Sequence, residues 1–190
     1  FSLVNMVGSS LARMSHRVIY LNCGPEIGVA ATKSFVSQLA IFYLLAFTMC
    51  NRLEEGVEKL RAICTSIEGC FSKNGQKLKR LAQQTKDKND FYYIARGINF
   101  AISAEGALKL KELSYIHAEG MPAGELKHGT LALIEEGTPV VVICPKDYTF
   151  DETLANAAET KARGAFVIGV SDERSPIFDE WIEIPQVEEI

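Results

Sequence analysis

The sequence predicts an α/β fold in which parallel β-sheets carry helices on both faces, and two observations lead to that prediction. Short apolar runs alternate with longer segments of helix-forming residues, and Gly or Pro marks most of the boundaries between them. The short runs are apolar throughout, as expected for strands that are buried on both sides. Ligands of such sheets bind beyond the carboxyl ends of the strands, so the loops after Cys23, Ala95 and Cys144 are of first interest.

The first quarter of the chain predicts one strand and one long helix. The strand is expected over residues 17–23, where Val, Ile and Tyr follow one another before a Gly-Pro pair. The helix is expected from Val29 to about Cys50. Its second half, residues 39–50, is apolar almost all round, but it is too short for a bilayer, which needs about 20 residues. We therefore expect a buried core helix.

Residues 53–87 differ in character from the segments on either side. Charged residues become more frequent, and apolar residues recur every three or four positions. Gly69 and the pair Asn74-Gly75 interrupt this pattern. Two amphipathic helices are therefore expected here, and they would also connect two larger units.

The second half of the chain shows the strand–helix alternation most clearly. Strands are expected at Phe91–Ala95, Pro139–Cys144, Ala165–Val170 and Trp181–Ile184, and helices at about 103–117 and 149–163. The Gly-rich segment 120–129 is expected to be a loop with room for one helical turn. His117 and Glu119 would then close the first of these helices, where the helix dipole favours a histidine.

The composition excludes several classes of protein. A chain with 47% hydrophobic and 23% charged residues folds around a core rather than staying disordered. A net charge of −4 argues against a dedicated nucleic-acid binder, and no apolar run is long enough for a membrane span. The five cysteines form no CxxC pair, so we expect free thiols and a reducing, cytoplasmic compartment.

Glu105, Lys109 and Glu112 form the first candidate cluster. Spacings of four and three residues place two carboxylates and one ammonium along one stripe of a helix. At a cleft, such a stripe can hold one carboxylate ready for proton transfer. The alternative is a solvated face of salt bridges, and spacing alone leaves both open.

His128 is the second candidate, in a Gly-flanked segment after Glu125. A histidine beside a carboxylate suits acid–base chemistry at neutral pH, although a purely structural histidine fits the same pattern. The set His117, Glu119, Glu125 and His128 lacks the spacing of a known metal site, so no metal is expected.

Residues 28–33, with the sequence GVAATK, follow a predicted strand and open a predicted helix. Backbone amides at a helix N-terminus bind anions, so this turn is a candidate for contact with a charged ligand. The motif is weak and is no P-loop, and on the motif alone a helix cap or simple packing is favoured for Thr32 over contact with a ligand.

Several segments resemble the sugar isomerase (SIS) domains of the glutamine–fructose-6-phosphate amidotransferase family, also called glucosamine-6-phosphate synthases. GPEIGVAATKSFVSQL, residues 24–39, resembles the first SIS domain of that family. EGALKLKELSYIHAE, residues 105–119, and GELKHGTLALIEEGTPVVVICP, residues 124–145, resemble the second. PQVEEI, residues 185–190, resembles the segment before the family's C-terminal region.

The resemblance implies flavodoxin-like parallel sheets arranged as tandem SIS domains. Residues 1–52 would be the C-terminal part of the first domain, residues 53–88 a helical connector, and residues 89–190 the second domain without its C-terminal tail. The family's phosphate-binding loop would precede residue 1, and the lysine that forms a Schiff base with the open sugar would follow residue 190. We therefore expect this chain, taken alone, to be catalytically incomplete.

The resemblance also implies an activity. Enzymes of this family make glucosamine 6-phosphate from fructose 6-phosphate and ammonia, which a glutaminase domain of the same polypeptide releases from glutamine. The sugar ring opens, an imine forms at carbon 2, and a proton moves from carbon 1 to carbon 2. The enzyme is expected to be a cytoplasmic homodimer that uses no metal or organic cofactor.

Residue by residue, the resemblance assigns four roles in the second domain. Glu112 matches the glutamate that transfers the proton, and His128 matches the histidine that assists ring opening from across the dimer interface. Lys109 matches a polar active-site position next to the reaction, and Glu105 matches a substrate-binding position on the same helix.

The remaining assignments fall in the first domain. Val29, Ala31 and Thr32 match a turn that contacts the substrate. Ala31 stands where the family commonly has a serine, so one hydroxyl contact is absent or comes from elsewhere.

Two other functions fit the same motifs. One is a sugar-phosphate deaminase or deglycase with two SIS domains and no glutaminase domain. The other is a non-catalytic SIS module that binds a sugar phosphate as a regulator, but such regulators usually lack the pair formed by Glu112 and His128.

Overall fold

The computed structural model describes residues 1–187, which divide into two compact units, residues 1–65 and 66–187. The first unit contains β1 (Ser2–Val4), α1 (Ser10–Met14), β2 (Val18–Tyr20) and α2 (Lys33–Met49). The helix α3 (Leu53–Thr85) begins in the first unit and ends in the second. The last residues of the PQVEEI segment, 188–190, lie outside the described residues.

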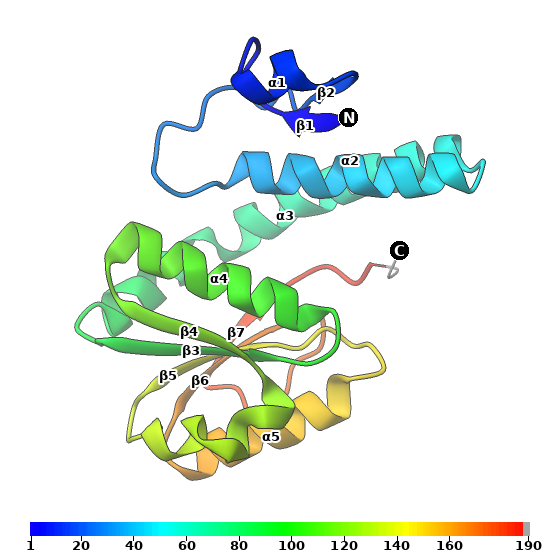
Figure 1. The fold of residues 1–190 in the computed structure, drawn as a ribbon. Helices are drawn as coiled ribbons and strands as arrows, with labels where there is room; N and C mark the ends of the chain where they lie inside the picture. The colour runs from blue at the N-terminus through cyan, green and yellow to red at the C-terminus, as the bar shows by residue number, and fades with distance from the viewer. Residues whose placement is uncertain (188–190) are drawn as a thin grey trace. The chain divides into compact units, whose positions relative to one another are not determined.

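The second unit is built around a five-stranded sheet (Figure 1). Its elements are β3 (Asp90–Ala95), α4 (Asn99–Ser114), β4 (His117–Pro122), the 3₁₀ helices η1 (Ala123–His128) and η2 (Thr130–Leu133), β5 (Pro139–Ile143), α5 (Phe150–Ala162), β6 (Phe166–Ser171) and β7 (Glu180–Glu183). All neighbouring strands are parallel, in the order β4-β3-β5-β6-β7. This is the flavodoxin-like order, and the α/β prediction is confirmed.

Alternate residues of the strands supply two separate cores. Ile94, Val140 and Val142 pack with Ala157 of α5 and Leu126 of η1. On the opposite face, the strands pack against α3 and α4, with a core that contains Phe91, Val141, Ile168, Leu81 and Ala107. The sheet therefore has α5 and η1 on one face, and α3 and α4 on the other. Figure 1 shows α4 and α5 on opposite sides of the sheet.

In the first unit, β1 and β2 form a parallel pair with Ser2 opposite Val18. The predicted strand at 17–23 is confirmed but shorter. The predicted helix begins at Lys33 rather than at Val29, because residues 28–32 form an irregular turn. The sequence pattern did not predict β1 or α1.

The expectation that residues 39–50 form a buried core helix is wrong. On α2, Phe42 is 56% exposed and Met49 is 86% exposed. The helix packs through Phe47 against Gly56 at the start of α3, where an added Cβ would lie 2.7 Å from the ring. A sheet of two strands offers too little surface to surround an apolar helix.

The expectation of two helices between 53 and 87 is also wrong, because α3 is continuous. Gly69 and Gly75 lie within it, and their Cα positions face open space. Asn74 does not end the helix, since its side chain is buried and has partners. Its Nδ2 donates to the carbonyl of Cys70 at 3.0 Å and to the carbonyl of Glu183 on β7 at 2.8 Å.

The elements of the second unit match their predicted ranges closely, with one correction. Residues 117–122 form the edge strand β4, so His117 and Glu119 do not close a helix. The preceding helix ends earlier because Tyr115 adopts a left-handed conformation with φ +61°. The predicted loop at 120–129 is therefore a strand end followed by the helical turn η1. No helix within residues 1–187 combines the length and apolar character of a membrane span.

Candidate active site

Helix α4 lies unusually close to the sheet, and two glycines make this possible. A Cβ on Gly120 of β4 would lie 2.5 Å from the Cα of Ala104, so only glycine fits at this contact. A Cβ on Gly106 of α4 would lie 3.0 Å from the ring of Tyr93 on β3. The inner side of α4 is thus packed directly against β3 and β4.

The three charged residues predicted to share this stripe do meet. Lys109 Nζ lies 2.6 Å from Glu112 Oε2 and 3.3 Å from Glu105 Oε1. The three side chains retain between 20% and 28% of their exposure, so they form neither a buried cluster nor a fully solvated face. We call this set, Glu105, Lys109 and Glu112, the α4 triad.

The electrostatics of the α4 triad follow from these contacts. The hydrogen bond to Glu112, followed by the one to Glu105, raises the pKa of Lys109. Lys109 is therefore an ammonium ion at neutral pH and cannot act as a base. Its positive charge lies beside both carboxylates of the triad, and an ionised carboxylate can accept a proton.

His128 lies at the end of η1, away from the α4 triad. It is exposed, and its neighbour Lys127 pairs with Glu159 of α5 at 2.9 Å. Because η1 packs on the α5 face of the sheet, His128 and Glu112 lie on opposite faces of the same unit. Within residues 1–187, no hydrogen bond or ion pair joins His128 to the α4 triad.

The other predicted substrate contacts lie in the first unit, between β2 and α2. Val29 is 85% exposed, Ala31 and Thr32 are exposed, and Ala30 between them is 4% exposed. Thr32 precedes α2 but makes no side-chain cap, so that reading of Thr32 is wrong. Its backbone N–H instead donates to Glu26 Oε1 at 2.9 Å.

The loops that follow β3 and β5 meet, as the parallel arrangement predicts. Asn99 Nδ2 donates to Asp147 Oδ2 at 2.7 Å. Asp147 also accepts from the backbone N–H and the hydroxyl of Thr149, both at 2.7 Å. Arg96, directly after β3, donates to Asn156 of α5 at 3.0 Å. These links fix the carboxyl edge of the sheet at the point where the strand order reverses.

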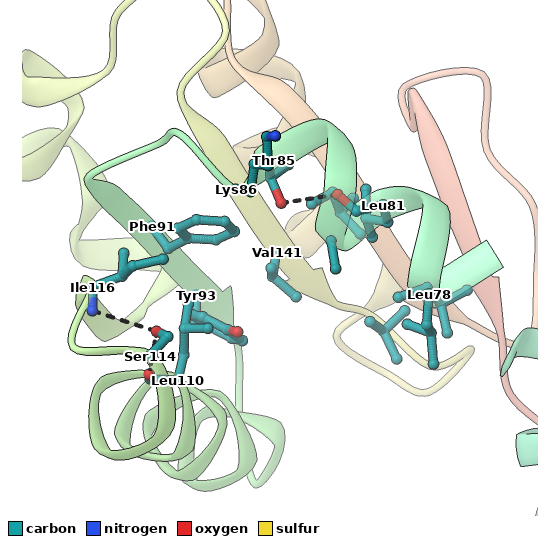
Figure 2. Close-up of a pocket in the computed structure, with 14 residues that line it drawn as sticks. Leu78, Leu81, Thr85, Lys86, Phe91, Tyr93, Leu110, Ser114, Ile116 and Val141 are labelled. Atoms are coloured by element: carbon teal, nitrogen blue, oxygen red, sulfur yellow. Dashed lines mark hydrogen bonds between the residues drawn. The ribbon is translucent and has the colours of Figure 1, made fainter. Parts of the chain in front are cut away.

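An apolar groove of about 680 Å³ lies between α3 and α4 over the central strands (Figure 2). Leu78 and Leu81 line it from α3, Leu110 from α4, and Tyr93 and Val141 from the sheet. Its polar groups are largely paired, since the Thr85 hydroxyl donates to the Leu81 carbonyl at 2.9 Å and the Ser114 hydroxyl to the Leu110 carbonyl at 2.6 Å. None of the predicted site residues lines this groove.

Among residues 1–187, no group of three or more His, Cys, Asp or Glu side chains is placed to hold a metal ion. His117 pairs instead with Asp90 of the neighbouring strand, with Nδ1 2.8 Å from Oδ1. The sequence reasoning missed the role of Glu26, whose contacts are described below. The one signal in the sequence was the position of this acidic residue shortly before the start of α2.

Comparison with known protein families agrees with this fold. A family model described as the SIS domain matches residues 1–48 and 85–190. The chain belongs to the SIS domain family. The two matched segments leave out most of α3, which begins at Leu53 and ends at Thr85.

Two relatives carry the comparison further. The glutamine–fructose-6-phosphate aminotransferase (isomerizing) of Thermococcus kodakarensis is 46% identical over the whole of this chain, which covers 33% of that protein. The C-terminal domain of a glucosamine–fructose-6-phosphate aminotransferase from Francisella tularensis superposes with a TM-score of 0.86 at 38% identity, covering 95% of this chain and 54% of that one. The chain thus spans about a third of the length of such full-length relatives.

A third likeness concerns the fold alone. The glucosamine-6-phosphate deaminase of Thermotoga maritima superposes with a TM-score of 0.74 at 24% identity, over 88% of this chain and 50% of that one. The SIS architecture is therefore shared by proteins with different names.

Proposed function

We propose that residues 1–190 are the central part of the isomerase half of a glutamine–fructose-6-phosphate aminotransferase, which makes glucosamine 6-phosphate. The observation that carries this proposal is the 46% identity with the Thermococcus kodakarensis protein over the entire chain. Residues 1–52 and 89–190 would belong to two SIS domains, joined by the connector 53–88. The family match at 1–48 and 85–190 supports this division.

The α4 triad suits the proton transfer in this reaction. After the sugar ring opens and ammonia forms an imine at carbon 2, a base removes a proton from carbon 1 and returns it to carbon 2. A single carboxylate can do both if it is ionised at the start and held between the two carbons, because the carboxylic acid formed in the first step then gives the proton to carbon 2. Lys109 holds Oε2 of Glu112, and no described residue donates a hydrogen bond to Oε1, so that oxygen is available as the base.

The placement of His128 supports a homodimer. His128 and Glu112 belong to elements that pack on opposite faces of one sheet, and no hydrogen bond or ion pair within residues 1–187 joins the two side chains. A second copy of the chain would supply the histidine for ring opening, as the family resemblance implies. Fructose 6-phosphate is the proposed substrate, a glutaminase domain of the same polypeptide the proposed source of ammonia, and the cytoplasm the proposed compartment.

The test uses the natural gene product that contains residues 1–190. We expect glutamine-dependent formation of glucosamine 6-phosphate from fructose 6-phosphate. Glu112→Gln should lower kcat by about 10²–10⁴-fold, because the shape is kept while the base is lost. Binding of the sugar phosphate, measured by calorimetry, should persist. Glu68→Gln, the same change on the exposed surface of α3, is the matched control and should leave turnover unchanged.

The alternatives give different results in the same assay. Deamination of glucosamine 6-phosphate without any use of glutamine would favour the deaminase class, whose fold this chain shares. Sugar-phosphate binding without turnover would favour a regulatory module. Normal turnover in Glu112→Gln would remove Glu112 from the mechanism.

A further inference from the structure

The turn between β2 and α2 has no regular structure, yet one side chain closes it. Glu26 Oε1 accepts hydrogen bonds from the backbone N–H of Thr32 at 2.9 Å, the backbone N–H of Ser34 at 2.9 Å and the Ser34 hydroxyl at 2.7 Å. Its other oxygen, Oε2, pairs with Lys33 Nζ at 2.9 Å. Lys33 Nζ also donates to the carbonyl of Pro25 at 2.7 Å. The carboxylate thus binds the start of α2 from six to eight residues away.

Glu26 fills the position that an anion would take at this helix N-terminus. The first turn of α2 contains no acidic residue, and Thr32 supplies no side-chain cap. A carboxylate there is favoured by the unpaired amides and by the helix dipole. The hydrogen bond from Lys33, followed by those from Ser34, lowers the pKa of Glu26 to about 2. Glu26 therefore occupies the amides of Thr32 and Ser34, which an external anion would otherwise bind.

The closure determines which residues of the turn face outward. Ala30, between Glu26 and Ser34 in the sequence, is buried, while Val29 and Ala31 on either side of it are exposed. A second link fixes the start of the turn, since Asn5 Nδ2 donates to the carbonyl of Gly24 at 2.5 Å. The turn is therefore held at both ends, and its outward side chains keep a constant presentation.

We propose that Glu26 is a positioning residue that shapes the turn at residues 29–32 for contact with the sugar phosphate. This inference rests on the proposed function, in which Val29, Ala31 and Thr32 contact the substrate. Glu26 touches neither the sugar nor the reacting atoms. It acts through the backbone of the turn, and the phosphate of the substrate binds at a place other than the N-terminus of α2.

Three variants of the natural gene product separate the contributions. Glu26→Ala removes all four contacts of the carboxylate. Glu26→Gln keeps an oxygen that can accept from Thr32 and Ser34. Lys33→Ala removes the ion pair and the hydrogen bond to the Pro25 carbonyl, on a side chain that is 47% exposed, but leaves the contacts of Glu26 with Thr32 and Ser34, and is the matched control. Hydrogen exchange at the amides of Thr32 and Ser34 reports on the turn, and kcat and KM for fructose 6-phosphate report on the substrate.

We expect amide exchange at Thr32 and Ser34 to be about tenfold faster or more in Glu26→Ala, because both amides lose their acceptor. KM for fructose 6-phosphate should rise about tenfold while kcat changes less than about threefold, as expected when binding contacts shift and the reacting groups do not. Glu26→Gln should restore KM to within about threefold of the parent value. Lys33→Ala should resemble the parent protein in exchange and in KM.

The results distinguish this inference from the proposed function. Unchanged exchange in Glu26→Ala, in an otherwise active protein, would overturn the positioning role alone. Faster exchange with an unchanged KM would show that the turn does not contact the substrate and would also overturn it. Failure of the parent protein to turn over fructose 6-phosphate would overturn the proposed function, and with it the link to substrate, whatever the exchange rates show.

Discussion

The two faces of the five-stranded sheet are buried by the same strands but packed differently. On the α5 face, Ile94, Val140, Val142 and Val167 are each 0% exposed. On the other face, α3 and α4 leave an apolar groove of about 680 Å³ over the central strands. Continuous apolar packing closes one face, whereas the other has a groove beside its apolar core and is also held by contacts at its two edges.

Those edge contacts explain the difference. Helix α4 packs closely on the edge strand β4, where Gly120 allows it to approach. At the opposite edge, α3 is linked to β7 by polar contacts, in which Asn74 donates to the Glu183 carbonyl at 2.8 Å and Lys77 to the Trp181 carbonyl at 2.5 Å. A helix held by polar groups at an edge does not need to fill the space beside it. The comparison teaches that coverage of a sheet face and dense packing on it are separate properties.

Substitutions of two neighbouring valines of β5 should show the largest difference in stability between the two faces. Val142→Ala, on the α5 face, should lower the free energy of unfolding by about 2–3 kcal/mol, because it leaves a closed cavity. Val141→Ala, on the groove face, should cost about 1 kcal/mol, since it only enlarges an existing groove. Urea unfolding followed by circular dichroism measures both. Equal losses would mean that the groove closes in solution.

A larger side chain should change the free energy of unfolding in opposite directions on the two faces of the sheet. Ala157→Leu, on α5 where Ala157 is 0% exposed, should destabilise the fold by about 1–3 kcal/mol through overpacking. Ala82→Leu, on α3 at the edge of the groove, should be stabilising by about 0.5–1 kcal/mol, because it buries apolar surface in space that is already open. Thermal unfolding measures the stability of both variants. A loss of stability in Ala82→Leu would contradict the conclusion that the groove face has unfilled space.

The smallest expected effect concerns the helix that borders the groove. Gly75→Ala should raise the free energy of unfolding by about 0.5–1 kcal/mol, since the new methyl group meets open space and alanine favours a helix. Gly106→Ala is the control, because its methyl group would lie 3.0 Å from the Tyr93 ring, which offsets the helical gain. If the two changes had the same effect in urea unfolding, then α3 would not behave as a helix that is open on this side.

The alternation of apolar strands and helices was predictable because the strands of the second unit are buried on both faces. The segment at 117–122 was not, since HAEGMP contains a histidine, a glutamate and a glycine and forms a strand by pairing with β3. The continuity of α3 could not be predicted from the sequence either. Asn74 stays helical through a partner more than one hundred residues away, which no local pattern contains.

The candidate site also has features that the local sequence predicts and features that depend on tertiary structure. Helical spacing correctly brought Glu105, Lys109 and Glu112 together, because contacts three and four residues apart depend only on the helix. The side of the sheet on which His128 lies depends on how η1 packs, and this follows from tertiary structure. The contacts of Glu26 cross an irregular turn, so no periodicity could indicate them.

The separation of His128 from Glu112 has a consequence for the stoichiometry of the proposed enzyme. In the proposed enzyme, each chain would offer the carboxylate of Glu112 to one site and the imidazole of His128 to another, so a single copy would hold half of each of two sites. Exchange about a two-fold axis completes both at once, giving as many sites as chains. An open row of copies would leave one unmatched half at each end, so the proposed mechanism favours closed two-fold symmetry.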